Sequence, residues 1–151
     1  MIRLGPFLYL FYSIGGDYMS QELSTLYIGI DVSKESNYTY ITNFNQSFHQ
    51  SFNTENNIHG AELIESNLIE VLHDKDYTKI ICVLESTGIY SAHIATYLSS
   101  SEKLFPYNIF VYCINPKISR NYRASFSDMD KTDPKDSFIL ADIARVGRTN
   151  S

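Results

Sequence analysis

The sequence predicts an α/β protein built on one mixed five-stranded sheet, with three antiparallel strands first and parallel β-α units after them. Short apolar runs of strand length recur along the chain. The later runs alternate with longer segments whose apolar residues follow the helical period. With 151 residues the chain is long enough for one domain with its own core.

The first three runs predict the antiparallel part of the sheet. Residues 26–32 are β-branched and almost wholly apolar, which is typical of a strand buried on both faces. Residues 36–43 and 47–52 alternate apolar and polar side chains, which indicates strands with one face in water. Because the turns between them are short, we expect a meander.

The rest of the chain alternates helices and strands. A helical stripe over residues 56–73 begins at a candidate N-cap, Asn56 or Asn57. The remaining elements are expected at residues 79–85 (strand), 89–100 (helix), 109–114 (strand), 117–126 (helix) and 134–147 (helix). This succession is that of an RNase H-like fold, here placed at residues 24–148.

The charge is unevenly distributed. A net charge of −5 and a pI near 5.3 argue against a simple basic nucleic-acid binder. Residues 117–148 nevertheless carry 7 Lys/Arg against 5 Asp/Glu, whereas residues 1–116 carry 5 against 12. We therefore expect phosphate contacts, next to the acidic residues described below, on a face formed by Lys117, Arg120, Arg123, Lys131 and Lys135. The alternative is a solvated helix face.

Several segments have no expected role in the site. Cys82 and Cys113 lie in apolar runs without metal-ligand spacing, which predicts buried, reduced thiols. No stretch reaches the length of a membrane span.

Residues 1–18 fit neither a strand nor an amphipathic helix, and we expect a mis-started leader, with translation beginning at Met19. A signal peptide and a genuine packing segment are the alternatives.

Two carboxylates interrupt the apolar strands. Asp31 lies within a strand expected to be dry on both sides, and Glu85 ends residues 80–84 in the same way. A buried carboxylate is disfavoured unless it is paired, protonated or bound to metal. Because these strands are neighbours in the predicted topology, we expect the two acids to be close enough to share an ion. The alternative is that each acid faces water at a strand end or caps a turn.

A second acidic pair precedes the final helix. Asp133 and Asp136 are three residues apart, so their side chains share a helix face. Capping and the helix dipole alone would explain both. Together with Asp31 and Glu85, they would form an all-oxygen ligand set, which selects Mg²⁺ or Mn²⁺. Two such ions can activate a water and stabilise the leaving oxygen of a phosphodiester.

Four short motifs carry a family resemblance. They are residues 29–34 (GIDVSK), 85–90 (ESTGIY), 115–117 (NPK) and 131–136 (KTDPKD). In order and spacing, over about residues 26–147, they resemble the N-terminal motifs of the IS-one-ten insertion-sequence transposases. These are DEDD transposases with a RuvC-like N-terminal domain.

The resemblance implies a metal-dependent DNA transposase of a mobile element. The four catalytic, metal-binding acids would be Asp31, Glu85, Asp133 and Asp136, holding two Mg²⁺ or Mn²⁺ ions. It also implies double-stranded DNA as substrate, an element-encoded guide (bridge) RNA, a homo-oligomer and a cytoplasmic, nucleoid-associated location. Ser137 stands where the family usually has Ala.

The family also has a C-terminal domain with a nucleophilic serine, and no serine of this chain can be assigned that role. We therefore expect a truncated product or excised domain that gives slow metal-dependent nicking at best.

Two other functions stay open. One is a catalytically inert transposon remnant that folds and binds nucleic acid. The other is a fragment of an actin-like sugar kinase, whose phosphate-binding opening resembles Gly29-Ile-Asp-Val32. Such kinases need further Gly-rich loops, and three of the seven glycines fall within the first sixteen residues.

Overall fold

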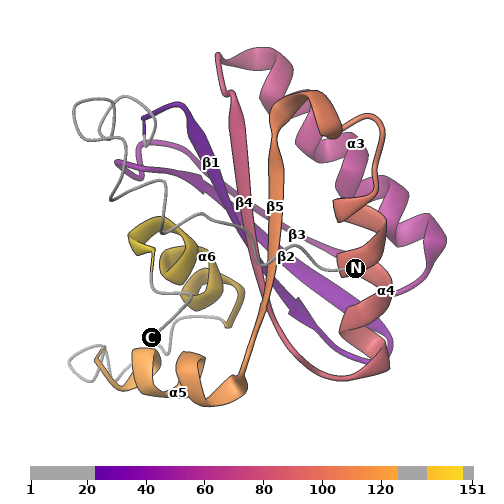
Figure 1. Cartoon of the computed structure of the whole chain (residues 1–151), viewed down its shortest axis with the longest axis vertical. Helices are drawn as coiled ribbons and strands as arrows, with labels where there is room; N and C mark the ends of the chain where they lie inside the picture. The colour runs from indigo at the N-terminus through magenta and orange to yellow at the C-terminus, as the bar shows by residue number, and fades with distance from the viewer. Residues whose placement is uncertain (1–22, 126–135, 148–151) are drawn as a thin grey trace.

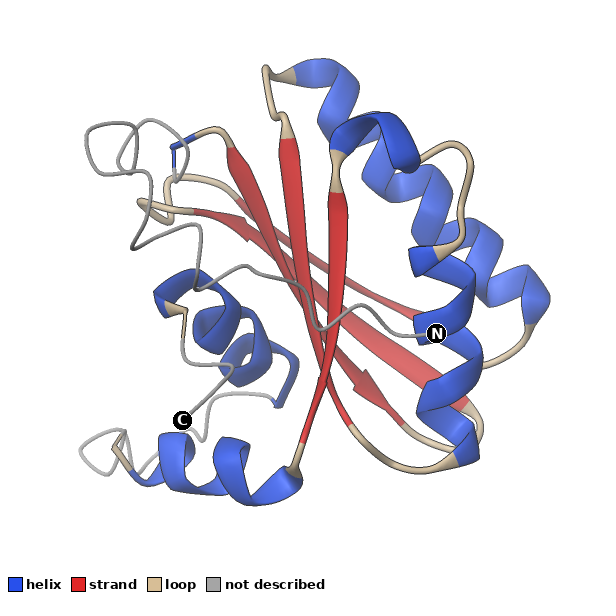
Figure 2. Ribbon diagram, in the orientation of Figure 1, coloured by secondary structure: helices blue, strands red, loops and turns tan. Residues whose placement is uncertain are grey.

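A computed structural model describes residues 23–125 and 136–147. One five-stranded sheet runs through the centre, in the order β3-β2-β1-β4-β5 (Figures 1 and 2). The strands are β1 Thr25–Val32, β2 Ser36–Asn43, β3 His49–Glu55, β4 Lys79–Glu85 and β5 Ile109–Ile114. The helices are α3 Ile58–Asp74, α4 Ile89–Ser99, α5 Pro116–Ala124 and α6 Asp136–Val146, with a 3₁₀ turn η2 at Phe105–Tyr107.

The strand directions are those that the sequence predicts. β1 pairs antiparallel with β2, and β2 pairs antiparallel with β3. β4 pairs parallel with β1 on one side and with β5 on the other. The mixed five-stranded sheet is therefore confirmed.

One predicted strand is displaced along the chain. The third strand was expected at residues 47–52, but β3 begins at His49. The Asn43 side chain accepts a hydrogen bond from the Phe48 backbone N–H at 3.2 Å and donates one to Ser47 Oγ at 2.9 Å. These bonds, together with Gln46 at φ 59°, hold residues 44–48 in a turn, so pairing resumes only at Thr42 and His49.

The two faces of the sheet carry separate cores. One core lies beneath α3 and α4 and includes Ile30, Leu84 and Ile94. The other lies beneath α6 and includes Tyr27, Val83 and Ile143. Figure 2 shows the two helical layers on opposite sides of the strands. β1 is buried along nearly its whole length because it has neighbours on both faces.

A glycine lets α6 approach the centre of the sheet. A Cβ atom at Gly29 of β1 would lie 2.1 Å from the Ser137 carbonyl oxygen and 2.3 Å from the Ala141 backbone nitrogen. Both contacts are with backbone atoms of α6, which cannot rotate away. The glycine of the GIDVSK motif is therefore required by the close packing of α6 on β1.

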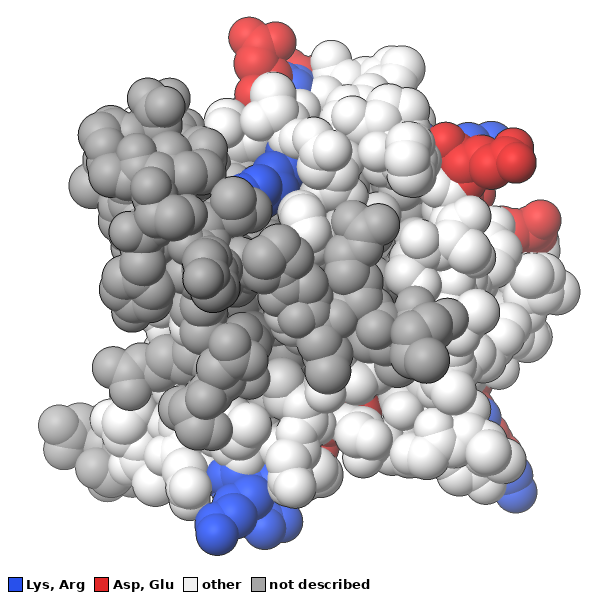
Figure 3. Space-filling model, viewed as in Figure 1, with Lys and Arg blue, Asp and Glu red and all other residues white. Residues whose placement is uncertain are grey.

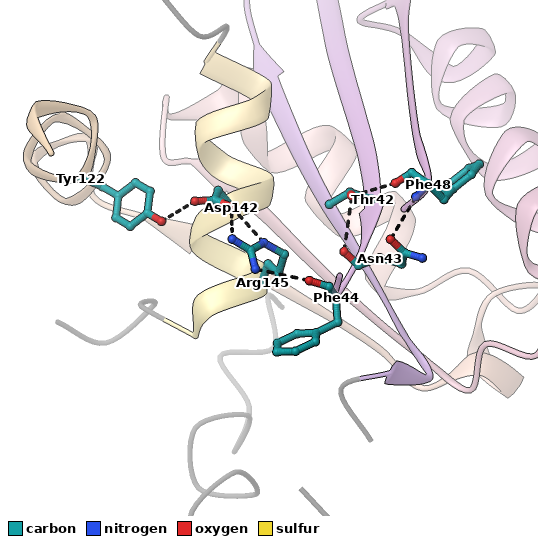
Figure 4. A network of polar contacts seen from close by, with 7 residues as sticks. All are labelled: Thr42, Asn43, Phe44, Phe48, Tyr122, Asp142 and Arg145. Atoms are coloured by element: carbon teal, nitrogen blue, oxygen red, sulfur yellow. Dashed lines mark hydrogen bonds and ion pairs between the residues drawn. The ribbon is translucent and has the colours of Figure 1, made fainter. Parts of the chain in front are cut away.

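A polar network anchors α6 to its neighbours (Figure 4). Asp142 accepts two hydrogen bonds from the Arg145 guanidinium, at 2.8 and 3.0 Å, and a third from the Tyr122 hydroxyl of α5. Arg145 also donates to the Phe44 carbonyl at 3.3 Å. The Asp142 side chain is 7% exposed and that of Arg145 20%. The charge of Arg145 is therefore matched inside the protein.

Removal of the carboxylate from this network is expected to destabilise the fold. Asp142→Ala removes the hydrogen bonds between the largely buried Arg145 guanidinium and its counter-ion, which should cost about 2 kcal/mol of unfolding free energy. Tyr122→Phe, which removes one hydrogen bond, should cost roughly 1 kcal/mol. Urea unfolding measures both values. An Asp142→Ala variant as stable as the parent chain would contradict this role.

The two cysteines are both free. Cys82 is fully buried, as the sequence predicts, whereas Cys113 is only partly buried. Burial raises the pKa of the Cys113 thiol to about 11 and that of Cys82 further still. Both thiols therefore stay protonated near neutral pH. Within the described ranges, no helix has the length and apolar character to cross a membrane.

Candidate metal and nucleic-acid site

Asp31 and Glu85 lie at the carboxyl ends of the two central parallel strands. The register pairs Ile30 of β1 with Leu84 of β4, and the two acids are the next residues on each strand. Ile30 and Leu84 point into the core beneath α3 and α4. Since side chains alternate along a strand, Asp31 and Glu85 both point to the opposite face. The structure thus places them on adjacent strands and on one face, as the sequence predicts.

Asp136 joins this face as the first residue of α6. Its influence on Asp31 is electrostatic: burial raises the pKa of Asp31, and the negative charges of Asp136 and Glu85 raise it further. The positive charge of Arg123 acts in the opposite direction. At this edge of the sheet the half-buried Asp31 therefore lies under the influence of two further negative charges.

Helix α5 contacts two of the three acids. Ser119 Oγ donates a hydrogen bond to Glu85 Oε2, and the Arg123 guanidinium forms an ion pair with Asp136. Asn115 caps the helix by accepting a hydrogen bond from the Lys117 backbone N–H at 2.8 Å, and Pro116 occupies its first turn. The Asn-Pro-Lys motif therefore begins α5 directly after β5, beside the acidic edge.

These groups surround a pocket of about 270 Å³. Its lining consists of Glu85, Pro116, Ser119, Arg120, Arg123, Asp136 and Ile139. Two carboxylates and two guanidinium groups thus face one polar hollow. Such a hollow suits a ligand that carries both negative oxygens and a bound cation.

The structure brings together only part of the predicted site. Asp31, Glu85 and Asp136 lie on one face. Asp133 lies outside the described residues, so its predicted capping of α6 stays a prediction.

The predicted basic face is also described only in part. Lys117 and Arg120 are exposed on α5, and the Arg123 side chain is 32% exposed. Lys131 and Lys135 also lie outside the described residues, as do residues 1–18. Figure 3 shows basic side chains gathered at the bottom of the molecule, where Figure 1 places α5.

The contact between Ser119 and Glu85 has no counterpart in the sequence predictions. A serine in an amphipathic helix gives no periodic signal, and 34 residues separate the two partners. The ion pair of Arg123 with Asp136 was missed for the same reason, and it gives Arg123 a partner other than phosphate. Both contacts depend on the position of α5, which follows β5 and packs against α6.

The donor chemistry of the acidic face fits a hard divalent cation. The available side-chain ligands are carboxylate oxygens, and their mutual repulsion is what a bound cation would relieve. Among residues 23–125 and 136–147, no three His, Cys, Asp or Glu side chains are grouped closely enough to hold a metal ion. In the described part of the chain, Asp136 is paired with Arg123 instead.

Comparison with known proteins places the chain in a family. A family model of DEDD transposases of the IS-one-ten (IS110) type, described as a transposase, matches residues 28–151. No curated protein sequence matches the chain. Among solved structures, RuvC of T. thermophilus in complex with a Holliday junction substrate is similar at a TM-score of 0.54 and 13% identity, covering 83% of this chain and 96% of that one.

A second structure of RuvC from Thermus thermophilus gives a TM-score of 0.51 at 13% identity, covering 81% of this chain and 96% of that chain. These likenesses confirm the predicted RNase H-like, RuvC-like fold. Neither comparison supports the sugar-kinase alternative. Since the family model spans most of the sequence, the chain belongs to the DEDD transposases of the IS-one-ten family.

Proposed function

We propose that this chain supplies the metal-dependent active site of an insertion-sequence transposase, acting on DNA phosphodiesters. The observation that carries the proposal is that three acids from separate elements lie on one face, at one edge of the sheet. Asp31 and Glu85 end adjacent central strands on one face, and Asp136 begins the helix packed against that face. Burial raises the pKa of Asp31, and the negative charges of Asp136 and Glu85 raise it further. Burial and like charges at one acid cost stability, and sites of this kind are typical of functional centres.

The residues that would hold Mg²⁺ or Mn²⁺ are Asp31, Glu85 and Asp136, with Asp133 as the fourth acid that the family resemblance implies. When bound, two such ions supply an activated water and charge stabilisation for the leaving oxygen. The protein keeps the acids in place through the sheet and through α5. Arg120 also lines the pocket, and its guanidinium group can contact a DNA phosphate there.

The DNA-contacting face is proposed to run along α5 from Lys117 to Arg123. Charge reversal at Arg120 (Arg120→Glu) is expected to weaken binding to duplex DNA about tenfold and to reduce the slope of log affinity against log salt by roughly one. Arg123→Glu is expected to weaken binding too, but also to disturb Asp136. Fluorescence anisotropy over a salt series measures both quantities. Lys103→Glu is the matched control, because Lys103 is exposed and lies after α4. Unchanged affinity in Arg120→Glu would place the interface elsewhere.

The direct test of the proposed activity is nicking of branched and nicked duplex DNA in Mn²⁺ or Mg²⁺. Slow nicking that stops on addition of EDTA is the expected result. Strand exchange is not expected from residues 1–151, because the family resemblance places the nucleophilic serine in a second domain. An inert remnant would bind DNA without any metal-dependent cleavage. Robust strand exchange by the purified chain would contradict the assignment of the nucleophile.

The remaining partners follow from the family. We propose that a structured guide RNA and further copies of the chain assemble with it on double-stranded DNA, at the nucleoid. Sequencing of RNA that copurifies with the chain, together with light scattering, tests these two partners. A chain that stays monomeric and retains no specific RNA would argue against them.

A further inference from the structure

Helix α5 contains a polar side chain that the proposed chemistry does not use. Ser119 is 5% exposed and lies one turn into the helix, against the end of β4. Its hydroxyl oxygen lies within hydrogen-bond distance of Glu85 Oε2 and, at 3.0 Å, of the Pro116 carbonyl. A hydroxyl group has one hydrogen to donate, so these two acceptors compete for it.

The carboxylate is the stronger acceptor of the two. Hydrogen bonds to an ionised group are roughly twice as strong as those between neutral groups, so the proton of Ser119 is directed to Glu85. The Pro116 carbonyl is an ordinary i−3 helix acceptor and does not require this proton. The bond therefore fixes Oε2 of Glu85 and leaves Oε1 to face a ligand.

We propose that Ser119 is a positioning residue for Glu85, orienting that carboxylate for a divalent cation. The inference rests on the proposed function and deepens it. Glu85 has three rotatable bonds between its backbone and its carboxylate, and it lies at the last position of β4. Without a fixed partner, its carboxylate would sample many orientations at the edge of the sheet. Hydrogen-bond partners that orient metal-binding carboxylates typically contribute a factor of about 10 to 100 in affinity or activity.

The Asn-Pro-Lys motif acquires a physical role through this contact. Asn115 and Pro116 fix the first turn of α5 immediately after β5, the strand that pairs with β4. In this register Glu85 lies opposite Ile114 of β5, and Asn115 is the residue that follows Ile114. The helix start therefore determines where Ser119 lies relative to Glu85.

A second serine–glutamate hydrogen bond, away from the acidic edge, provides a matched control for Ser119 and Glu85. Ser101 is 8% exposed and donates a hydrogen bond to the largely buried Glu65 of α3. This pair has the same chemistry as Ser119 and Glu85. It lies on the α3 and α4 side of the sheet, within a pocket lined by Glu62, Glu65, Tyr97 and Lys103 among others. A serine that only supports the fold should behave as Ser101 does.

The experiment compares Ser119→Ala, Ser119→Thr and Ser101→Ala in the full 151-residue chain. Mn²⁺ affinity is measured by calorimetry and by the electron paramagnetic resonance signal of free Mn²⁺, and melting temperature is measured without metal. Ser119→Ala is expected to weaken Mn²⁺ binding about tenfold. Ser119→Thr retains the hydroxyl group and should bind Mn²⁺ with close to the parental affinity. Ser101→Ala is expected to lower the melting temperature while leaving Mn²⁺ affinity unchanged.

Three results would overturn the inference, and they are distinguishable. If Mn²⁺ binds and Glu85→Gln weakens it, but Ser119→Ala binds with parental affinity, then Ser119 does not position Glu85 and the proposed function stands. If the parent chain shows no Mn²⁺ binding that depends on Glu85, both the proposed function and this inference fail. A loss of affinity in Ser119→Ala that Ser119→Thr does not restore also contradicts the role of the hydroxyl.

Discussion

Asp31→Asn and Glu85→Gln are each expected to reduce metal-dependent DNA nicking by about a hundredfold or more while the chain stays folded. Both amides keep the size of the acid but remove the negative charge that binds a cation. Removal of a partner that only orients a ligand costs about 10 to 100-fold, so loss of the ligand itself should cost at least as much. A nicking assay over time, with circular dichroism for folding, measures the result.

The stability of the same variants provides a second readout. Burial and like charges raise the pKa of Asp31, so the folded chain holds that proton more tightly than the unfolded chain does. In metal-free buffer, stability should therefore fall as the pH rises through the pKa of the folded state. Asp31→Asn removes this dependence and should be at least as stable as the parent at neutral pH. Asp76→Asn, in the exposed turn before β4, is the control for this stability measurement.

For the nicking assay, parental rates in both Asp31→Asn and Glu85→Gln would contradict the account.

Gly29→Ala is expected to destabilise the chain by about 3 kcal/mol, or roughly 10 °C in melting temperature. The added methyl group would meet the Ser137 carbonyl at 2.1 Å and the Ala141 nitrogen at 2.3 Å. Because both atoms belong to the backbone of α6, the whole helix has to move away from β1. Asp136 begins that helix, so Mn²⁺ affinity should fall in the same variant.

The control for this substitution is Gly88→Ala. Gly88 has φ 69°, and a Cβ there would have no atom within 4 Å. Its replacement should therefore cost only backbone strain, about 1 to 2 kcal/mol, because φ 69° with ψ −132° is a conformation that L residues rarely adopt. Thermal and urea unfolding compare the two. Equal stability losses in Gly29→Ala and Gly88→Ala would contradict the close approach of α6.

Most of the fold could be predicted because its signals are local in sequence. β2, β4 and β5 have the predicted bounds, since alternating or fully apolar runs mark them clearly. Helix α3 begins after Asn57, whose side chain accepts a hydrogen bond from the Gly60 N–H at 2.8 Å. Asn56, the other candidate cap, instead donates to the carbonyls of Ser33, in the turn after β1, and of Tyr90, in the first turn of α4. A choice between adjacent asparagines depends on those distant carbonyls, which sequence alone does not place.

The acids of the proposed site stand out in the sequence for a different reason. Charged residues inside apolar strands are costly, so Asp31 and Glu85 were conspicuous. The contacts that α5 makes with this edge could not be predicted. Serine and arginine are common in helices, and nothing in the sequence near Ser119 or Arg123 indicates a distant partner. Their partners lie 34 and 13 residues away in sequence, and the position of α5 directly after β5 and against α6 brings them together.

The most direct test of the acidic site is Mn²⁺ titration of the ¹⁵N-labelled chain, followed by nuclear magnetic resonance. Paramagnetic broadening falls steeply with distance, so it locates the ion without any assumption about activity. The account predicts that amide signals next to Asp31, Glu85 and Asp136 broaden first, and that Asp31→Asn abolishes this selectivity. Broadening centred on the exposed acids of α3, such as Glu62 and Glu70, or no residue-specific broadening at all, would contradict it.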